Sequence, residues 1–410
     1  MKKFLQNFAL FISALAFAVL ACEGMFYFLN KDSAPPEIET INTMPSGERL
    51  DFFKYHPVYG FSGTPNISKQ LYGKYVTHNS RGYRGPELDY VKAAGTRRVV
   101  FVGDSQTWGW GVSDNETISH FTGQLLNERT ADAKYEVVNL GASGFGIDQS
   151  YLRLLMEGMR YQPDHVVFTY FADNDVWEMA NTQAWGVEKP YLYENGEGEL
   201  CISNFPPRRS SGWPADNLAS IVENKFNLKV LRFSIAGKEI DLAKTQTAEY
   251  FKNRSLSMSL FDEWGVDGDP VIAIKEHFDC VESEAGPQLP SWSDKLQMAI
   301  KLIRQMEATV KNSGGEFYVV TKPIEEDYRN NQQKADYEFI LSRLRYYGIN
   351  VLDMHSVALA HGFVGDNLYI QYGHLSPAGT RLVAESLTGE ILEGGASATV
   401  AAGAAPAHAL

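Results

Sequence analysis

The sequence predicts an α/β fold: a doubly wound, mainly parallel five-stranded sheet that carries an insertion. Short apolar, β-branched runs alternate with runs of helical pattern along much of the chain. Such alternation predicts a parallel sheet whose connecting helices cover both of its faces. Three of the apolar runs end in polar turns, and the carboxyl ends of strands are where ligands of such sheets bind.

The expected elements alternate in chain order. The expected strands are residues 97–103, 136–140, 165–171, 316–321 and 349–353. The expected helices lie near residues 116–128, 148–161, 293–313, 335–347 and 377–392. The alternation stops after the third strand and resumes with the third helix. We therefore expect residues 97–178 and 292–395 to form one domain around the sheet.

The first expected strand ends in Gly103-Asp104-Ser105. A sharp turn between this strand and a following helix exposes the serine hydroxyl and leaves the serine N–H pointing outwards. A nucleophile for acyl transfer needs both features. The same three residues are equally typical of an ordinary helix cap, in which Asp104 or Ser105 accepts a backbone N–H.

Later segments supply the other groups that acyl transfer needs. They are residues 139–144, 171–175 and 373–379. In this interpretation Ser105 is the nucleophile and His374 is the base. The N–H groups of Ser105 and Gly144 and the side-chain amide of Asn174 are the donors for the oxyanion. Taken alone, Asn174 is typical of a turn and His374 of a protein surface.

In their order along the chain, these four residues resemble the signature of the SGNH (GDSL-type) hydrolase family. The resemblance covers residues 78–178 and 295–395, and residues 79–85 (Asn-Ser-Arg-Gly-Tyr-Arg-Gly) resemble a segment of membrane-anchored bacterial members. It implies a flavodoxin-like SGNH fold, serine esterase or acyltransferase activity, and the four roles just described.

The acid that orients the base is not in its usual place. The family has an aspartate two or three residues before the histidine, where this chain has Tyr372 and Gln371. Neither side chain is a carboxylate, so the remaining candidates are Asp353 and Asp366. We expect Asp366 to be the catalytic acid; without one, the site is a Ser–His dyad or is degenerate.

The N-terminal residues 1–30 predict a membrane anchor. Lys2 and Lys3 precede an apolar stretch that is long enough to cross a bilayer, and the positive-inside rule leaves the rest of the chain outside. We expect a single-pass inner-membrane protein whose catalytic domain lies in the periplasm or outside. A cleaved signal peptide and a lipoprotein cleaved before Cys22 are the alternatives.

The remaining segments connect or interrupt these parts. The sequence of residues 31–96 predicts a stalk followed by irregular structure, and that of residues 396–410 predicts a disordered tail. Residues 179–291 predict an insertion beside the mouth of the active site, with a hairpin that turns at Asn195-Gly196. Two cysteines of the insertion, Cys201 and Cys280, either form a disulfide in an oxidising compartment or remain buried thiols.

Charge and motifs limit the ligands. The net charge of −13 argues against nucleic acid or an anionic membrane surface as the main partner. We expect no cofactor, because Asp114 stands where a Gly-x-Gly-x-x-Gly phosphate loop would need its third glycine. We expect no metal either, because the acidic cluster between Asp262 and Asp269 lacks the EF-hand spacing and is typical of a solvated loop.

The sequence therefore predicts an esterase or O-acyltransferase for acyl esters, chiefly acetyl esters, of an envelope or secreted polysaccharide. The tryptophans at 108 and 110 offer faces for a sugar or an acyl group, unless they belong to the core. A lipase or lysophospholipase with the same site is one alternative, with a lipid as the acylated substrate. A catalytically weak, polysaccharide-binding assembly factor is another, and the missing aspartate favours it.

Overall fold

A computed structural model gives the fold and the side-chain contacts. It describes residues 52–171, 174–184, 187–207, 232–235, 238–241, 274, 277–282, 286–287, 289, 291–322, 331–362, 367–370 and 373–393. Residues 1–30, the acidic cluster of the insertion, Asp366 and the C-terminal tail lie outside these ranges. Within them, no helix has the length and apolar character needed to cross a bilayer.

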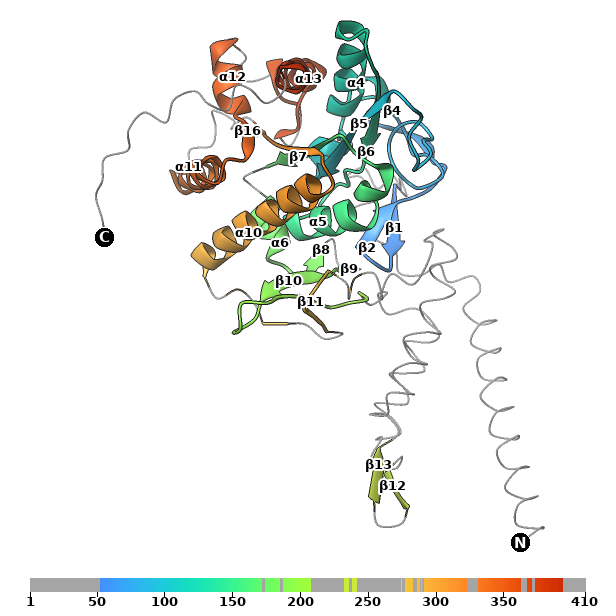
Figure 1. Ribbon diagram of the computed structural model, residues 1–410, viewed down its shortest axis with the longest axis vertical. Coiled ribbons are helices and arrows are strands. Elements are labelled where there is room, and N and C mark those ends of the chain that lie inside the picture. The colour runs from blue at the N-terminus through green and yellow to red at the C-terminus, as the bar shows by residue number, and fades with distance from the viewer. Residues whose placement is uncertain are drawn as a thin grey trace, which may run out of the picture.

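The predicted five-stranded parallel sheet is confirmed (Figure 1). Its order is β16-β15-β7-β5-β6. The strands are β5 (Thr96–Gly103), β6 (Lys134–Asn139), β7 (His165–Tyr170), β15 (Glu316–Thr321) and β16 (Asn350–Leu352). Every residue of β7 is buried, as expected of a central strand covered on both faces.

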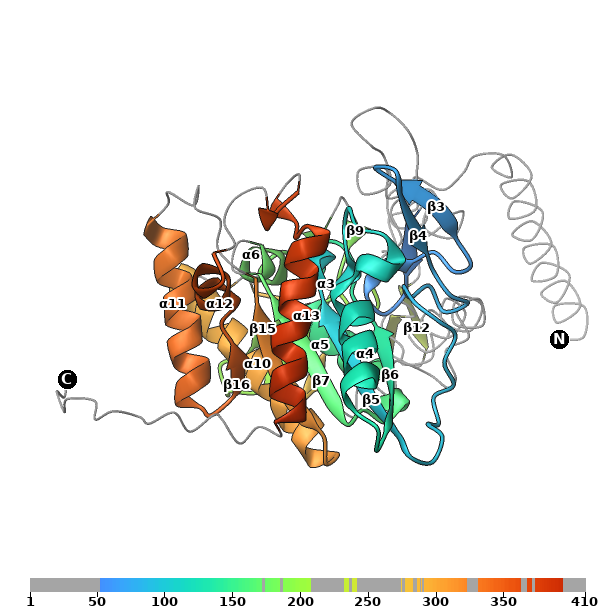
Figure 2. The same ribbon diagram turned by 90° about the horizontal axis from the view of Figure 1, so that it is seen from above.

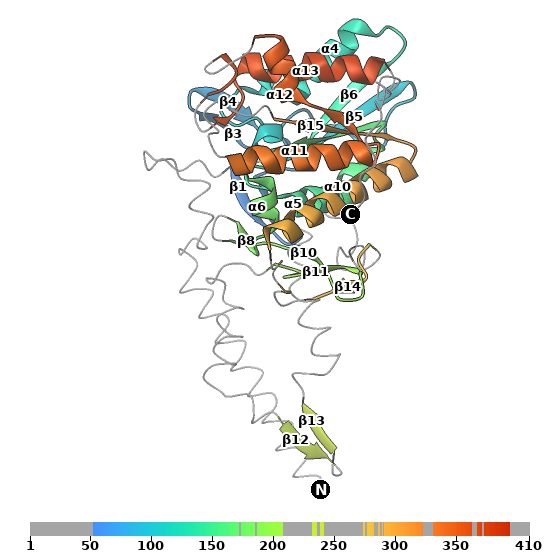
Figure 3. The same cartoon turned by 90° about the vertical axis from the view of Figure 1, so that its left-hand side faces the viewer.

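Helices cover both faces of the sheet (Figures 2 and 3). On one face lie α4 (Ile118–Arg129), α12 (Met354–Ala360) and α13 (Pro377–Leu392). On the other lie α5 (Ile147–Met156), α10 (Trp292–Asn312) and α11 (Asn331–Tyr346). Alternate residues of β5 enter the two cores: Val100 packs with α5 and α10, and Phe101 packs with α4 and α13.

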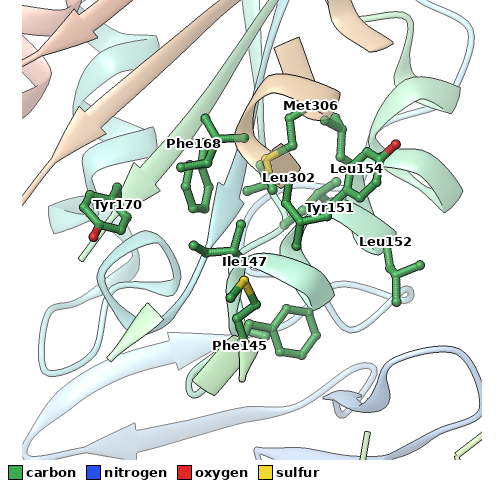
Figure 4. Close-up of a cluster of buried hydrophobic side chains, with 14 of the residues drawn as sticks. Phe145, Ile147, Tyr151, Leu152, Leu154, Phe168, Tyr170, Leu302 and Met306 are labelled. Atoms are coloured by element: carbon green, nitrogen blue, oxygen red, sulfur yellow. The ribbon is translucent and has the colours of Figure 1, made fainter. Parts of the chain in front are cut away.

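The larger core lies between the sheet, α5 and α10 (Figure 4). Phe168 of β7, Ile147 of α5 and Leu302 of α10 are all buried there. This packing holds the start of α5, and with it the loop that precedes α5, against the centre of the sheet. That loop contains Gly144.

Residues 31–96 were expected to hold a stalk and irregular structure, but part of this segment forms regular strands. Two hairpins form, β1 (Phe53–His56) with β2 (Gly60–Gly63) and β3 (Ser68–Leu71) with β4 (Lys74–Thr77). Their strands are short, and β2 is fully buried although it begins and ends with glycine. Tertiary packing rather than strand propensity therefore accounts for β2, whereas β3 and β4 are mostly exposed or half-buried.

The insertion contains the expected hairpin. Strands β10 (Tyr191–Glu194) and β11 (Leu200–Ser203) pair antiparallel, and Asn195-Gly196 lies in the connection. Strand β14 (Cys280–Val281) pairs parallel with β11. A disulfide joins Cys201 to Cys280, whose Cα atoms are 4.7 Å apart, so of the two alternatives left open by the sequence the structure has the disulfide.

Candidate active site

The nucleophile turn lies where the central strand β5 ends. The short helix α3 (Ser105–Trp108) starts there, and the Asp104 side chain caps it by accepting the Gln106 N–H at 2.9 Å. A Cβ at Gly103 would lie 2.3 Å from Thr107 Oγ1, so the turn requires glycine. Both interpretations of this motif hold: Asp104 is the cap, and Ser105 is the residue presented at the helix start.

Ser105 and His374 meet although 269 residues separate them. Ser105 Oγ lies 2.8 Å from His374 Nε2, within the range in which a base takes a proton from a nucleophile. Ser105 is 6% exposed and His374 is half-buried. The hydroxyl is therefore largely shielded from water but borders a surface that a substrate can reach.

A residue that sequence reasoning missed fixes the histidine loop. Gln106 follows the nucleophile, and its Nε2 donates to the Gly373 carbonyl at 3.4 Å while its Oε1 accepts the Leu375 N–H at 3.3 Å. These bonds bracket His374. No signal in one sequence identifies this role, because a polar residue in the first turn of a helix is ordinary.

The loop after β6 is held against the nucleophile turn. The Ala142 N–H donates to the Gly103 carbonyl at 3.1 Å, and a Cβ at Gly141 would lie 2.4 Å from the Trp108 nitrogen. Gly144 follows with φ of +80°, a conformation that favours glycine. Among the described residues neither the Ser105 N–H nor the Gly144 N–H has a hydrogen-bond partner. Both are thus free to receive an oxyanion.

Asn174 belongs to the same group of residues. It precedes α6 (Asp175–Met179) and makes no side-chain cap bond there. Its side chain is hydrogen-bonded to Asp104, the residue next to Ser105. In the described part of the chain its Oδ1 is buried without a partner. An amide has two N–H donors, so one can bond Asp104 while the other serves a substrate oxygen.

Buried charge surrounds Asp104. Burial raises the pKa of its carboxyl, while the bonds from Gln106 and Asn174 and the charge of Lys322 oppose this rise. Lys322 is 3% exposed, follows β15, and lies 3.9 Å from the centre of the Phe171 ring. The carboxyl ends of β5, β7 and β15 thus converge on the nucleophile turn, as the fold requires.

Asp353, one candidate for the acid, has another role. It caps α12, and its carboxylate accepts bonds from Tyr337 at 2.8 Å, Arg345 at 3.2 Å and the Ser356 hydroxyl at 2.9 Å. These contacts all lie among β16, α11 and α12. Asp366, the preferred candidate, is outside the described residues, so its role stays a prediction.

The two tryptophans after Ser105 differ in environment. Trp108 is 1% exposed and its indole N–H donates to His78 Nε2 at 3.0 Å, so it is a core residue. Trp110 is half-buried, and its ring centre lies 5.9 Å from that of His374 at an interplanar angle of 30°. Only Trp110 belongs to the site.

A serine–histidine pair with unpaired backbone donors, at the carboxyl end of a doubly wound sheet, defines a serine hydrolase that acts on acyl groups. The comparison with known families agrees. The GDSL-like lipase/acylhydrolase family matches residues 101–382, which is more than half of the chain, and the chain belongs to this family. No curated protein matches the chain.

Several solved structures are similar to the chain at low identity. The acetyl xylan esterase AlAXEase is 13% identical, covering 72% of this chain and 99% of its own, with a TM-score of 0.37. Axe2, an acetylxylan esterase from Geobacillus stearothermophilus, is 12% identical. The match covers 72% of this chain and 94% of Axe2, and its TM-score is also 0.37. LAE5, an α/β hydrolase from the metagenome of Lake Arreo in Spain, is 13% identical. The match covers 73% of this chain and 97% of LAE5, with a TM-score of 0.36. The family assignment rests on the family match alone.

Proposed function

We propose that this serine esterase acts on acetyl esters of an envelope or secreted polysaccharide, and that it transfers the acetyl group to water or to another sugar hydroxyl. The contact of 2.8 Å between Ser105 Oγ and His374 Nε2 is the observation that carries the chemical part of the proposal. It pairs the nucleophile with the base that activates it.

In the proposed reaction, Ser105 Oγ attacks the ester carbonyl carbon as its proton moves to His374 Nε2. The carbonyl oxygen becomes an oxyanion that accepts bonds from the N–H groups of Ser105 and Gly144 and from the Asn174 amide. Collapse of this intermediate breaks the bond to the sugar oxygen, which takes the proton from His374. The acetyl group then remains on Ser105.

The second half of the reaction returns the enzyme. A water molecule or a second sugar hydroxyl gives its proton to His374 and attacks the acetyl carbonyl, and Ser105 leaves with that proton restored. Water gives acetate, and a sugar hydroxyl gives a new acetyl ester. Asp366 would orient His374 and stabilise its charged form, as an acid does in a serine triad.

We also propose that residues 1–30 hold the enzyme in the inner membrane with the catalytic domain outside the cytoplasm. The charge pattern of the N-terminus supports this topology. The Cys201–Cys280 disulfide supports an oxidising compartment. Both features fit a substrate in the envelope.

The test is acetate release by the purified full-length protein in detergent. Acetylated polysaccharides should release acetate with parent protein and not with the Ser105→Ala variant. An acceptor oligosaccharide added to the reaction separates transfer from hydrolysis by mass spectrometry. Cleavage of lysophospholipid without any release from acetylated sugars would contradict the proposed substrate class and leave the serine esterase assignment intact.

A further inference from the structure

A run of aromatic rings leads from the catalytic histidine to solvent. Trp110 lies next to His374, as described above. The ring centre of Tyr72 lies 6.4 Å from that of Trp110, at an interplanar angle of 65°. Tyr72 is 42% exposed, whereas Trp110 is half-buried. A substrate that reaches Ser105 can therefore contact both rings.

The backbone at Tyr72 is in a conformation that tyrosine rarely adopts. Tyr72 and Gly73 connect β3 to β4, and their φ angles are +51° and +76°. A two-residue hairpin turn with positive φ at both positions prefers Asn-Gly, because asparagine tolerates the left-handed region and large side chains do not. Residues held in such conformations cluster at functional sites.

The hairpin that bears Tyr72 is fixed to the loop that bears Trp110. Lys74 Nζ forms an ion pair with Glu116 at 2.8 Å. The buried guanidinium of Arg84 donates to the Tyr75 carbonyl of β4 at 3.2 Å and to the Trp108 carbonyl at 3.1 Å. These bonds hold the two aromatic residues as one unit. The β3–β4 hairpin and helix α3 lie towards the same end of the sheet (Figure 2).

The chemistry of this surface favours a sugar ring. Tyrosine and tryptophan combine a flat apolar face with a polar edge, which matches a pyranose with its C–H face and hydroxyl rim. A fatty acyl chain is instead best held by an enclosed apolar pocket, and a ring that is 42% exposed does not provide one.

We propose that the exposed ring of Tyr72 stacks against a pyranose ring of the acylated polysaccharide, next to the sugar whose ester reaches Ser105, and that Trp110, which meets Tyr72 edge to face, forms the adjoining wall of this platform. The platform deepens the proposed function and rests on it. It makes Tyr72 a residue that determines specificity for carbohydrate esters over small esters.

The first test compares Tyr72→Asn with the parent. Asparagine suits the turn, so we expect the melting temperature to rise while the platform is lost. We expect kcat/KM for O-acetylated xylo-, manno- or cello-oligosaccharides to fall about tenfold more than kcat/KM for p-nitrophenyl acetate, mainly through KM. The matched control is Tyr75→Ala, because Tyr75 is on the same hairpin and is 61% exposed. It should lower neither value.

The outcomes separate this inference from the proposed function. Equal losses for both kinds of ester in Tyr72→Asn, an equal effect of Tyr75→Ala, or a parent with no preference for any acetylated oligosaccharide would overturn the platform and leave the esterase. A second measurement needs no turnover: calorimetric titration of unacetylated oligosaccharides into Ser105→Ala and into Ser105→Ala with Tyr72→Asn. Weaker binding to the double variant supports the platform, and equal or absent binding to both contradicts it.

Discussion

The side chain of Gln106 bonds to the backbone on both sides of His374, so the residue next to the nucleophile also places the base. The two catalytic residues come from distant parts of the sequence, and Gln106 joins them through the Gly373 carbonyl and the Leu375 N–H. The distance between Ser105 and His374 therefore depends on a residue that takes no part in the chemistry.

Replacing Gln106 with leucine tests this positioning role. The variant keeps a similar volume but loses both bonds, each of which contributes about 1 kcal/mol. We expect kcat for p-nitrophenyl acetate to fall about tenfold or more with little change in KM, because a small displacement of the base weakens proton transfer. The control is Gln124→Leu, at an exposed glutamine of α4. A change in KM alone, or unchanged kcat, would show that Gln106 does not position His374.

Replacing each of the two candidate aspartates, Asp366 and Asp353, should have different effects on kcat and on the melting temperature. If Asp366 orients His374, Asp366→Asn lowers kcat by about four orders of magnitude without lowering the melting temperature. Asp353→Asn should instead lower the melting temperature and leave kcat nearly unchanged, because Asp353 caps α12. An active parent whose Asp366→Asn variant loses less than tenfold would leave a Ser105–His374 dyad.

Glu178 should make stability depend on pH. Burial raises the pKa of its carboxyl to about 7, with the charges of Asp148 and Asp104 adding to this effect and Lys189 opposing it. Its Oε2 is buried without a partner among the described residues. As pH rises from about 4.5 to about 7, the unfolded chain releases this proton before the folded protein does, so the free energy of unfolding falls.

The variant Glu178→Gln removes this cost. Its melting temperature should equal that of the parent at about pH 4 and exceed it at about pH 8, where the free energies of unfolding differ by up to about 3 kcal/mol. The buried Asp148–Lys189 pair is present in both proteins, so the comparison reports the loss of the Glu178 carboxyl together with its coupling to this pair. Glu128→Gln, on the exposed side of α4, is the control. Parallel pH profiles for parent and Glu178→Gln would refute a buried, uncompensated carboxyl at this position.

The sheet was predictable because it leaves local patterns, and the Ser–His pair was predictable because four motifs follow one another in the order of a known family. The β-branched run before Gly103 identifies a strand end without tertiary information. Pro377, directly before Ala378-Gly379, identifies a helix start in the same way. Gln106 and Tyr72 were not predictable in this way. Their roles come from contacts across the fold, which residue type alone does not encode. Gln106 contacts a loop that is far away in the sequence, and Tyr72 lies on a strained turn beside Trp110.

The proposed topology has a direct test. A phosphatase that is active only outside the cytoplasm, fused after residue 50, should be active and should sediment with membranes, because Lys2 and Lys3 stay on the cytoplasmic side. The control replaces both lysines by glutamate and should reduce the exported fraction. An active fusion that is released as a soluble protein would favour the cleaved signal peptide, and an inactive one would contradict export.

The central claim is that Ser105 is a nucleophile activated by His374. Labelling with a fluorophosphonate tests it most directly, because the reagent reacts with an activated serine and not with an ordinary folded surface. We predict that the parent is labelled at Ser105, that Ser105→Ala and His374→Ala are not, and that circular dichroism shows all three folded. A folded parent that resists the reagent, or one labelled at another residue with Ser105→Ala still cleaving p-nitrophenyl acetate, would contradict the account.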